Sequence, residues 1–594
     1  MALETIPRTV LGNGRRFGSA PAYFVRGAGG WEPTSWRDYA AEVRQAGAAL
    51  TALGVEPGQA VGILGANRPE WVILDVGAMA AGAVPAGIYT TSSPAECAYI
   101  LNHCEAPVLL VENEAQWAKI ASVRGELPHL RHVVTMWGTT VDDPMVLGWE
   151  EFLAKGEKGP AERALDQRLD DLRADTVSTY NYTSGTTGRP KAVMLTQDNL
   201  AWTARQACEL ADCTSDDRIV SYLPLSHVAE QMFTIHIAAV AGYPVYYAQS
   251  IDKLNANLIE AQPTIFFGVP RVWEKFHAGV VEKLAENTGV KAKLIEAATA
   301  VGRRVVPRRY GQAQALPLQD AVQYTAFEKL VYSKVQDGLG LRAARMCVSG
   351  AAPLSQEVLE FFAGFGLPIY EVYGQSEDCG PTTFNHPGRM KFGTVGPSFP
   401  GVEVKIANDG EIIVRGRNVF AGYAKDPEAT AEALADGWLH TGDLGEFDED
   451  GFLSITGRKK DIIITAGGKN VAPKLLEGGI RNHPLVSEAV VIGDRRKFLT
   501  ALVSLDPEAV AKFRQVRGLT DLGPPDQSPE IRGEIEQAVD QVNTEMARVE
   551  QIKKFTILPR ELSIAQGELT PTLKVKRNVI AEHFSPEIEA MYAD

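Results

Sequence analysis

The chain of 594 residues contains 59 Lys or Arg and 74 Asp or Glu residues, which give a formal net charge of −15. Hydrophobic residues make up 45% and charged residues 22% of the sequence. These are ordinary values for globular proteins, and they exclude a disordered, fibrous or polytopic membrane protein. The acidic excess argues against broad electrostatic binding to nucleic acid. The length predicts roughly two to four domains.

The cysteines include no Cys-x-x-Cys pair and are too sparse for a disulfide scaffold, which favours a reducing cytoplasm. The first residues lack the apolar core of a secretory signal. Two apolar stretches, 76–89 and 231–248, are interrupted by Gly, Pro or His and are predicted to be buried helix and strand rather than membrane spans. Peripheral contact with a membrane surface and a homodimer both stay open.

Short apolar, β-rich segments alternate with helical patterns through much of the chain. The expected strands are 177–182, 219–223, 245–248, 264–267, 346–349 and 368–372, and the expected helices are 199–210, one beginning at 227, 251–261, one beginning at 270, and 355–365. Strands that alternate with helices predict an α/β fold with mainly parallel sheets. Residues 288–340 are polar and are predicted to form an inserted helical segment.

The pattern changes after about residue 400. Short strands at 402–406, 411–415 and 451–456, separated by Asp-Gly turns, predict a β-rich subdomain. A smaller α+β unit follows, with strands at 486–492 and 499–505 and a helix at 528–548. The charged stretch 457–461 suggests a boundary, so that residues 1–459 form a large domain and 460–594 a small one.

Several familiar catalytic motifs are absent from the sequence. It contains no Walker Gly-x4-Gly-Lys-Ser/Thr loop, no Gly-x-Ser-x-Gly elbow and no His-Glu-x-x-His pair. Nucleotide chemistry would therefore need another phosphate cradle.

Residues 182–191, Tyr-Thr-Ser-Gly-Thr-Thr-Gly-Arg-Pro-Lys, supply one. The segment lies between an expected strand and an expected helix. Its glycines let the backbone approach a polyphosphate closely. Its hydroxyls and backbone N–H groups can donate to phosphate oxygens, and its lysine adds a positive charge. The alternative is an ordinary Ser/Thr/Gly surface turn.

The whole string resembles the signature loop of the acyl-adenylate-forming (AMP-binding) superfamily, which includes acyl-CoA synthetases and luciferases. Further blocks resemble the family's motifs in the family's order. They are Pro-Leu-Ser-His-Val-Ala-Glu at 224–230, Ser-Gly-Ala-Ala-Pro at 349–353, Tyr-Gly-Gln-Ser-Glu at 373–377, Thr-Gly-Asp at 441–443, Gly-Arg-Lys-Lys-Asp at 457–461 and Leu-Thr-Pro-Thr-Leu-Lys-Val-Lys-Arg at 569–577. The resemblance spans most of the chain.

The resemblance implies a large adenylation domain, a small mobile C-terminal domain and a reaction in two steps. A carboxylate first attacks the α-phosphorus of ATP and releases pyrophosphate. A thiol, usually that of coenzyme A, then attacks the acyl-adenylate. The expected small-molecule partners are therefore a fatty acid, ATP with Mg²⁺, and coenzyme A, with no nucleic acid.

The resemblance also assigns the phosphate and metal groups. The residues expected to cradle the β- and γ-phosphates are Thr183, Ser184, Gly185, Thr186, Thr187, Gly188 and Lys191. Glu377 is the expected Mg²⁺ ligand, because Mg²⁺ prefers carboxylate oxygen and keeps several waters. The family usually has threonine where this chain has Ser376, which keeps the hydroxyl.

A second group of residues is expected to bind the nucleoside. The adenine set comprises Gly350, Ala351, Ala352, Glu371, Tyr373, Gly374, Gln375 and Ser376. Asp443 is expected to accept from both ribose hydroxyls, and Arg458 to reach the ribose and phosphate. Asp or Asn is commoner in the family where this chain has Glu371. A core role for Tyr373 and a turn-capping role for Asp443 are the alternatives.

Lys574 is expected to be the catalytic lysine of the first step, bridging carboxylate and α-phosphate. Many family members have Ser-Gly-Lys here, and Lys576 is only two residues away, so both lysines stay candidates. His227 is expected near the substrate carboxylate, with a structural role as the alternative. Lys460 is expected to be the hinge of the C-terminal domain, or else a surface charge.

The segment Tyr-Glu-Val-Tyr-Gly at 370–374 resembles the bubblegum type of fatty acyl-CoA synthetase. Three features resemble the long-chain fatty acyl-CoA synthetase branch. They are Gly-Val-Pro-Arg-Val-Trp at 268–273, the form of the last block, and Ala-Gly-Gly-Lys-Asn-Val-Ala-Pro at 466–473. Trp273 is expected to gate the acyl tunnel, unless it is a core tryptophan. Gly467 and Lys469 are expected to face coenzyme A after the C-terminal domain rotates. The alternatives are a fatty acyl-AMP ligase that loads a carrier protein and a non-catalytic acyl-binding relative.

Overall fold

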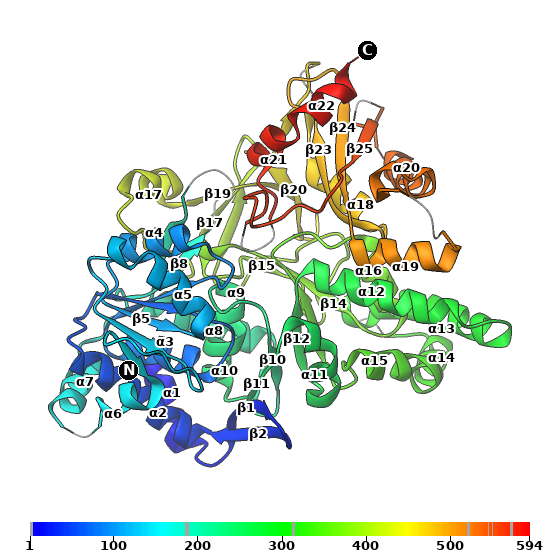
Figure 1. Cartoon of the computed structure of the whole chain (residues 1–594). Coiled ribbons are helices and arrows are strands. Elements are labelled where there is room, and N and C mark those ends of the chain that lie inside the picture. The colour runs from blue at the N-terminus through cyan, green and yellow to red at the C-terminus, as the bar shows by residue number, and fades with distance from the viewer. Residues whose placement is uncertain are drawn as a thin grey trace.

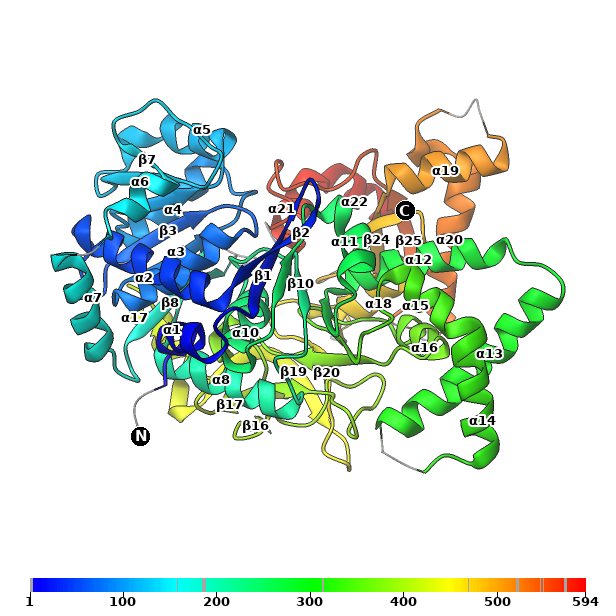
Figure 2. The same ribbon diagram turned by 90° about the horizontal axis from the view of Figure 1, so that it is seen from below.

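The computed structural model describes residues 4–157, 159–183, 189–311, 315–467, 469–519, 523–544, 546–548, 550–570 and 574–593. Figure 1 shows a large lower body that runs from blue to yellow, with the orange and red C-terminal elements above it. Figure 2 shows α13 (Val290–Val306) and α14 (Leu318–Phe327) projecting to one side of that body.

The largest sheet has eight strands in the order β18-β9-β8-β4-β3-β5-β6-β7. Its strands are β3 (Ala60–Leu64), β4 (Val84–Ile88), β5 (Val108–Val111), β6 (His132–Thr135), β7 (Val146–Gly148), β8 (Val177–Thr183), β9 (Lys191–Thr196) and β18 (Gly422–Tyr423). Strands β3 to β8 pair in parallel, whereas β9 pairs antiparallel with both β8 and β18. The antiparallel β8–β9 pair therefore lies on either side of the signature loop.

Helices connect the parallel strands of this sheet and provide much of its cover. They include α2 (Trp36–Ala52), α3 (Pro69–Ala80), α4 (Pro94–Cys104), α5 (Glu114–Ser122), α6 (Trp149–Ala154), α7 (Pro160–Asp171) and α8 (Gln197–Leu210). Every residue of α3 after Pro69 is buried, and β4 after it is buried too, so the apolar stretch 76–89 is core helix and strand as predicted.

Two further sheets complete the α/β part of the body. One has the order β10-β11-β1-β2 and comprises β1 (Pro21–Gly27), β2 (Gly30–Ser35), β10 (Ile219–Ser221) and β11 (Val245–Tyr247). The other has the order β12-β13-β14-β15 and comprises β12 (Ile265–Gly268), β13 (Met346–Ser349), β14 (Ile369–Tyr373) and β15 (Thr383–Phe384). Strands β12, β13 and β14 are parallel, so their carboxyl ends meet at one edge.

The helices of this region follow the expected alternation. They are α1 (Ile6–Arg16), α9 (Val228–Gln231), α10 (Ala238–Ala241), α11 (Leu254–Ala261), α12 (Pro270–Ala285), α13, α14, α15 (Ser333–Leu339) and α16 (Gln356–Gly364). Between α9 and α10 the chain forms a π-helix at Met232–Ile237, which the sequence pattern did not predict. Such π-helical turns inside α-helices occur frequently at functional sites.

The predicted β-rich subdomain is a four-stranded antiparallel sheet. It comprises β16 (Glu403–Ile406), β17 (Glu411–Arg415), β19 (Leu439–Phe447) and β20 (Leu453–Arg458), in that order across the sheet. Helix α17 (Pro427–Ala433) precedes β19. This sheet carries two of the expected blocks, since Asp443 pairs with Arg458 across β19 and β20.

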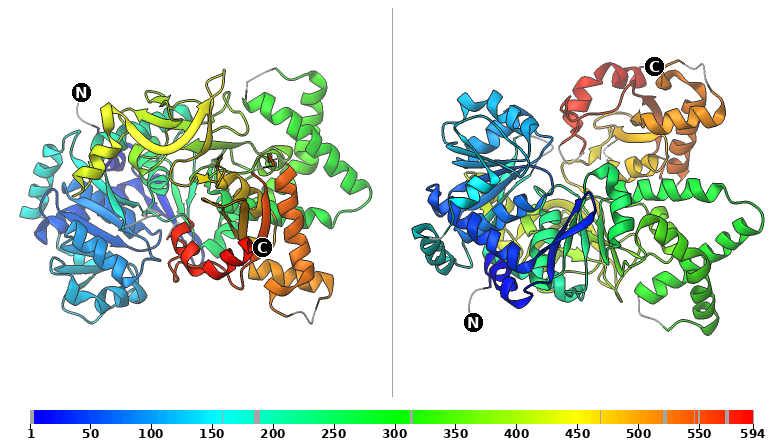
Figure 3. Two further views of the ribbon diagram at one scale, coloured as in Figure 1. Left: turned by 90° about the horizontal axis from the view of Figure 1, so that it is seen from above. Right: turned by 60° about the horizontal axis from the view of Figure 1, so that its bottom comes forward.

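The C-terminal part contains the hairpin β21 (Ile463–Ile464) and β22 (Asn470–Val471) and a sheet in the order β23-β24-β25. The sheet strands are β23 (Val486–Ile492), β24 (Leu499–Leu505) and β25 (Ile552–Ile557). Its helices are α18 (Pro473–Arg481), α19 (Pro507–Arg517), α20 (Pro529–Thr544), α21 (Arg577–His583) and α22 (Ser585–Tyr592). The two views of Figure 3 show these elements gathered as a unit beside the body.

The hydrophobic cores follow the same division. Two clusters draw all their residues from positions beyond 460, one around Leu499 and one around Ile580. Three others lie entirely before 460. Among the described residues, we find no helix that combines the length and apolar character needed to span a bilayer.

Candidate active site

The turn after β14 has room for only one residue type at its start. A Cβ atom on Gly374 would lie 1.5 Å from the carbonyl oxygen of Gly380. Inside the turn, the Gln375 N–H donates to Asp378 Oδ1 at 2.8 Å and the Thr382 hydroxyl donates to the other carboxylate oxygen. Asp378 is fully buried, and burial raises its pKa to about 8. Asp378 therefore holds the turn that presents Glu377.

Glu377 lies in the 3-10 turn Ser376–Asp378 and is half-buried. The Tyr423 hydroxyl donates to Glu377 Oε1 at 2.8 Å. The same tyrosine ring lies under Lys191, whose Nζ is 4.9 Å from the ring centroid. Lys191 Nζ is also 3.7 Å from Asp426 Oδ2. The expected metal ligand and the expected phosphate lysine therefore share one neighbour, Tyr423.

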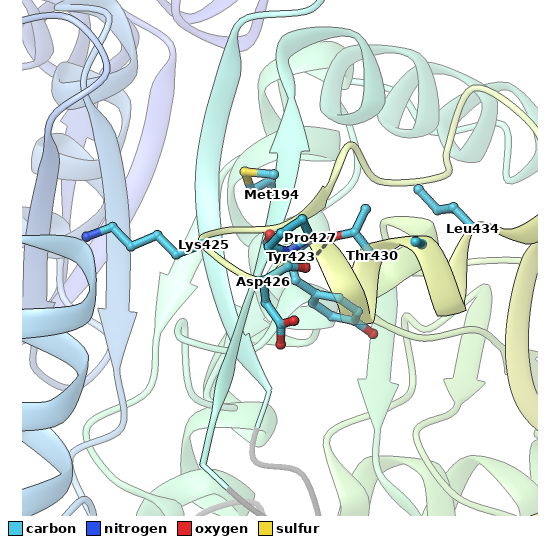
Figure 4. A pocket seen from close by; sticks show the side chains of 8 residues that line it. Met194, Tyr423, Lys425, Asp426, Pro427, Thr430 and Leu434 are labelled. Carbon is cyan, nitrogen blue, oxygen red and sulfur yellow. Dashed lines mark hydrogen bonds between the residues drawn. The ribbon is translucent and has the colours of Figure 1, made fainter.

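A cavity of about 450 Å³ lies beside this group. Figure 4 shows Tyr423 and Asp426 among its walls, with Met194 and Leu434, and shows Lys425 pointing away from them. Lys425 Nζ instead pairs with Glu105 Oε1 at 2.5 Å. Of the groups near the site, Tyr423 and Asp426 line this cavity. A larger cavity of about 840 Å³, lined by none of the predicted site residues, lies at the carboxyl ends of β3, β5 and β10.

Tyr373, Asp443 and Arg458 form a contiguous polar group. The Tyr373 hydroxyl donates to Asp443 Oδ2 at 3.0 Å. Arg458 Nε lies 3.5 Å from Asp443 Oδ1. Burial, followed by the nearby Asp443 charge, raises the pKa of Tyr373 well above its ordinary value. Three residues from separate sequence blocks therefore meet where the nucleoside is expected.

Glu411 supports the turn that carries Asp443, and the sequence motifs did not mark it. Its Oε1 accepts from the Gly442 N–H at 2.8 Å. Its Oε2 accepts from Lys459 Nζ at 2.7 Å and faces His440 Nδ1 at 2.8 Å. Burial alone would raise the pKa of Glu411, but these partners outweigh burial and lower it. Glu411 thus links the Asp443 turn to the residue beside the predicted hinge.

Lys574 reaches the same region from the C-terminal part of the chain. Its N–H donates to Thr570 Oγ1 at 3.0 Å, and its carbonyl accepts from the Thr570 N–H at 2.8 Å. Its surface is open to solvent, yet the surrounding protein, followed by the charges of Arg458 and Lys474, lowers its pKa. The carboxylates of Asp443 and Glu377 act in the opposite direction. Lys574 is therefore a water-accessible side chain whose pKa responds to the charges of predicted site residues.

His227 caps the helix α9 that follows it. Its Nδ1 accepts from the Ala229 N–H at 3.2 Å, which makes the neutral ring the stable form. Burial, followed by the positive charge of Lys574, lowers its pKa to about 4. The charge of Lys574, in the small unit, therefore acts on the pKa of a histidine in the large one.

The predicted adenine loop leaves β13 in a strained conformation. Ala351 has a φ of +70°, a region that residues with a side chain seldom adopt. A Cβ on Gly350 would lie 2.7 Å from Val372 Cγ1, so the loop packs tightly on β14. Glu371 on β14 is buried, and burial raises its pKa to about 8. A neutral carboxyl at Glu371 offers a carbonyl acceptor and a hydroxyl donor.

Other predicted residues lie apart from this centre. Lys460 is exposed in the turn after β20. Gly467 and Lys469 are exposed at the tip of the β21–β22 hairpin, where the Lys469 N–H donates to Thr465 Oγ1 at 3.2 Å. Ser184, Gly185, Thr186, Thr187 and Gly188 lie outside the described residues. Thr183 ends β8, and its hydroxyl donates to the Lys191 carbonyl at 3.4 Å.

Trp273 occupies an aromatic core. It has no exposed surface and packs edge-on against Phe266 and Phe362. Its Nε1 donates to the carbonyl oxygens of Gly268 and Val348 at 3.1 and 3.3 Å. This is the core position named as the alternative, and a gating role stays a prediction that would require the ring to leave these contacts.

Three residues of the site had no local sequence signal that we recognised. Tyr423 lies in the two-residue strand β18, and Glu411 comes directly after a common Asp-Gly turn. Lys474, whose charge lowers the pKa of Lys574, pairs at 3.7 Å with Asp461, the last residue of the 457–461 block. Each acts through tertiary contact, so neighbouring residues in sequence do not mark it.

The AMP-binding enzyme family matches residues 12–424, and the AMP-binding enzyme C-terminal domain matches residues 460–594. The chain belongs to the AMP-binding enzyme family. The family resemblance stated from the motifs is thereby confirmed. The match to the C-terminal domain begins at the residue where the sequence suggested a boundary.

The chain is similar over nearly its whole length to curated enzymes. It is 42% identical to a long-chain-fatty-acid–CoA ligase of Mycobacterium bovis, over 95% of this chain and 93% of the relative. It is 37% identical to the long-chain-fatty-acid–CoA ligase ACSBG2 of Xenopus laevis, over 95% of this chain and 80% of the relative. The human ACSBG2 ligase is 36% identical, over 99% of this chain and 92% of the relative.

Solved structures share the fold at lower sequence identity. The adenylation domain of a carboxylate reductase from Mycobacterium chelonae matches with a TM-score of 0.77 and 21% identity, over 100% of this chain and 92% of that chain. An anthranilate CoA ligase in complex with anthranoyl-AMP matches with a TM-score of 0.70 and 22% identity, over 98% and 97% of the two chains. The predicted fold class is confirmed.

Proposed function

We propose that this chain is an ATP-dependent long-chain fatty acid–CoA ligase that forms an acyl-adenylate and then an acyl-CoA. The observation that carries this proposal is the contact of Asp443 with Tyr373 and Arg458, beside an exposed Lys574 on whose pKa the charges of Arg458 and Asp443 act. The names of the most similar relatives support the substrate class. ATP and coenzyme A are the co-substrates.

In the first step, a carboxylate oxygen of the fatty acid bonds to the α-phosphorus while the bond from phosphorus to the bridging oxygen breaks. Pyrophosphate leaves with the bonding electrons. Two anions must approach each other, so fixed positive charge is needed where negative charge develops. We assign that role to Lys574, with Arg458 beside it. Lys576 is the weaker candidate, because the charges that influence Lys574 are those of the site.

The phosphates would lie along Thr183, residues 184–188 and Lys191, and Glu377 would hold Mg²⁺. Glu377 fits this ion because one of its oxygens is positioned by Tyr423, while its other oxygen has no hydrogen bond within the described residues. A single carboxylate suffices, since Mg²⁺ keeps waters and binds substrate phosphates. Bound Mg²⁺ would supply positive charge to the polyphosphate.

The nucleoside would bind between the 350–352 loop and the turn after β14. Glu371, Tyr373 and residues 374–376 would contact adenine. Asp443 would accept from the ribose hydroxyls in exchange for part of its contact with Tyr373. His227, neutral at physiological pH because of its lowered pKa, would lie near the fatty acid carboxylate without repelling Lys574.

In the second step, the coenzyme A sulfur bonds to the acyl carbon while the bond from that carbon to the AMP phosphate oxygen breaks. AMP leaves with the bonding electrons, and the thiol proton passes to water. We propose that residues 460–594 rotate about Lys460 between the steps, which brings Gly467 and Lys469 toward coenzyme A. The separate hydrophobic cores on either side of residue 460 support this boundary. Rotation of a domain with its own core costs little internal packing.

The acyl chain would run from His227 into the body, with Trp273 as the proposed gate. We place the enzyme in the cytoplasm, with contact at a membrane surface as the source of long-chain acids. A homodimer is compatible with this arrangement. The assignments of compartment, membrane contact and homodimer rest on the sequence and the family.

The experiment measures pyrophosphate and AMP release from ATP with saturated acids from about C2 to C24, each with and without coenzyme A, because every buried CH₂ contributes about 0.8 kcal/mol to binding. The proposal expects release that requires a long-chain acid and yields acyl-CoA. Adenylate that accumulates without thioester would instead indicate a ligase that loads a carrier protein. No ATP consumption with any acid would indicate a non-catalytic relative.

A further inference from the structure

Helix α12 divides its surface between two parts of the molecule. Val272, Trp273 and Val280 are buried in the core of the large domain. Arg271, Glu274 and Glu282 lie three and then eight positions apart, a spacing that puts them on one face of a helix. This second face points to the C-terminal domain, and the proposed chemistry makes no use of it.

Arg271 makes the most direct contact across the domain boundary. Its Nη1 donates to the carbonyl oxygen of Ser487 on β23 at 2.8 Å. Its Nη2 lies 4.0 Å from Asp506 Oδ2, which is the residue that caps α19. A guanidinium that binds a backbone carbonyl and a carboxylate at once fixes both distance and orientation. Arg271 therefore holds the start of β23 and the start of α19 together against α12.

One further charged contact lies along the same helix face. About two turns beyond Glu274, Glu282 pairs with Lys512 of α19. On α18, Arg481 pairs with Glu488 at 3.4 Å. Burial alone would lower the pKa of Arg481, but the charges of Glu488 and then Glu274 raise it. The contacts thus span most of the length of α12.

We propose that Arg271 and Glu282 form a latch that holds the C-terminal domain in the orientation that places Lys574 at the active site. These are positioning residues, since none of them touches the reacting groups. The inference rests on the proposed function, because a rotation about Lys460 that exposes the site to Gly467 and Lys469 would separate α12 from β23 and α19. The latch therefore favours adenylate formation and must open for thioester formation.

The strength of these contacts suits a latch that opens in each turnover. Glu282 and Lys512 are each about half exposed (54% for both side chains). An exposed ion pair shifts an equilibrium by no more than about fivefold. The charge-assisted bond from Arg271 to Ser487 contributes more than an exposed pair. Removing Arg271 should therefore shift the orientation measurably without unfolding either domain.

The first experiment measures the two half-reactions separately in the full chain. Pyrophosphate release without coenzyme A reports adenylation, and acyl-CoA formed from supplied acyl-AMP reports the second step. Arg271→Ala should slow the first about three- to tenfold through kcat, with KM for the fatty acid unchanged, and should leave the second equal or faster. Lys275→Ala, on the exposed side of α12, is the matched control and should alter neither.

A charge exchange tests whether the contact itself matters. Glu282→Lys and Lys512→Glu should each slow adenylation, and the double variant should recover it, because the pair is restored with reversed sign. Equal losses in both half-reactions for Arg271→Ala, or a double variant that is slower than either single variant, would overturn the latch. A raised KM for the fatty acid with unchanged kcat would also overturn it, since Arg271 would then act on acyl binding.

A covalent version of the contact gives a readout that does not depend on activity. Glu282→Cys and Lys512→Cys are joined with a short bis-maleimide, and the cross-link is identified by mass spectrometry. Wild-type protein treated with the same reagent is the control, because Cys104, Cys208 and Cys213 are partly exposed. The latch predicts an efficient cross-link, retained adenylation and loss of thioester formation by about tenfold or more.

Absence of a cross-link between positions 282 and 512, or a cross-linked enzyme that forms thioester at the full rate, would contradict the latch. Failure of the proposed function is a different result, in which the untreated wild-type protein carries out neither half-reaction with any acid. The cross-link would still report the contact in that case.

Discussion

Tyr423 joins two charged groups from separate motifs. Its hydroxyl donates to Glu377, and its ring lies under the ammonium group of Lys191. Loss of the hydroxyl in Tyr423→Phe keeps the ring and its contact with Lys191, while Glu377 loses the donor that positions it. We expect kcat for adenylation to fall about tenfold and the Mg²⁺ concentration at half-maximal rate to rise, because a hydrogen bond to a charged group contributes about 1.5–3 kcal/mol.

The measurement is the rate of pyrophosphate release over a Mg²⁺ titration, with wild type and Tyr423→Phe in parallel. Tyr247→Phe, at a buried tyrosine on β11, controls for loss of a hydroxyl elsewhere in the body. Identical Mg²⁺ dependence in wild type and Tyr423→Phe would contradict the role of Glu377 as the metal ligand.

His227 gives the fold a dependence on pH. Its pKa is lowered from 6.5 to about 4 in the folded protein. Between these values the unfolded chain binds a proton at this position that the folded chain does not, so the free energy of unfolding falls as the pH drops from about 6.5 to about 4. Above pH 6.5 the residue has no such effect.

Thermal unfolding of wild type and His227→Asn across this pH range checks the prediction. Asparagine can accept the same N–H bond from Ala229 but does not titrate. We expect wild type to lose about 1–3 kcal/mol more than the variant over the window, since one pKa unit corresponds to about 1.4 kcal/mol. Parallel pH profiles for the two proteins would show that His227 is not buried in its neutral form.

At the scale of elements, the turn after β14 depends on the absence of a side chain at Gly374. An added Cβ would overlap the Gly380 carbonyl, and both belong to the backbone that orients Glu377. We expect Gly374→Ala to abolish ATP binding and to lower the unfolding temperature, because backbone atoms cannot move aside as a flexible side chain can. Gly12→Ala is the control.

Gly12 lies in α1, where a new Cβ meets nothing within 4 Å, so alanine there should leave the stability unchanged or raise it. Isothermal titration with ATP and thermal unfolding distinguish the two variants. A Gly374→Ala protein that binds ATP with wild-type affinity would show that the turn does not form part of the nucleotide site.

The sequence predicted elements well where the pattern is local. Strands β13, β17, β23 and β24 have the predicted bounds, because short apolar or alternating runs between turn residues define them. The π-helix after α9 was not predictable, since its apolar pattern differs little from that of an α-helix. Strand β18 was missed because two residues carry no periodicity. Pairing with β9 is what brings it into the sheet.

In the candidate site too, residues with a local motif could be predicted and residues placed by distant partners could not. Tyr373, Asp443 and Arg458 were named from separate sequence motifs, and the structure brings these three into contact. Glu411 and Tyr423 were not named, because their roles arise from partners far away in the chain. Trp273 shows the limit in the other direction, since its motif suggested a gate and its packing is that of a core residue.

At the scale of the whole molecule, the proposed site needs residues from both domains. We assign to it Glu377, Asp443 and Arg458 of the large domain and Lys574 of the small one, because the charges of the first three act on the pKa of Lys574. The contacts of α12 with β23 and α19 accompany this arrangement. The second half-reaction does not need Lys574 if the domain rotates, so the two half-reactions should separate under one substitution.

The most direct test is therefore Lys574→Ala, with Lys576→Ala as the matched control two residues away. The account predicts that Lys574→Ala lowers acyl-AMP formation about 100-fold or more, while thioester formation from supplied acyl-AMP and coenzyme A stays within about twofold of wild type. Lys576→Ala should leave both nearly unchanged. Normal adenylation by Lys574→Ala, or loss of adenylation in Lys576→Ala instead, would contradict the assignment of Lys574 and with it this view of how the two domains complete the site.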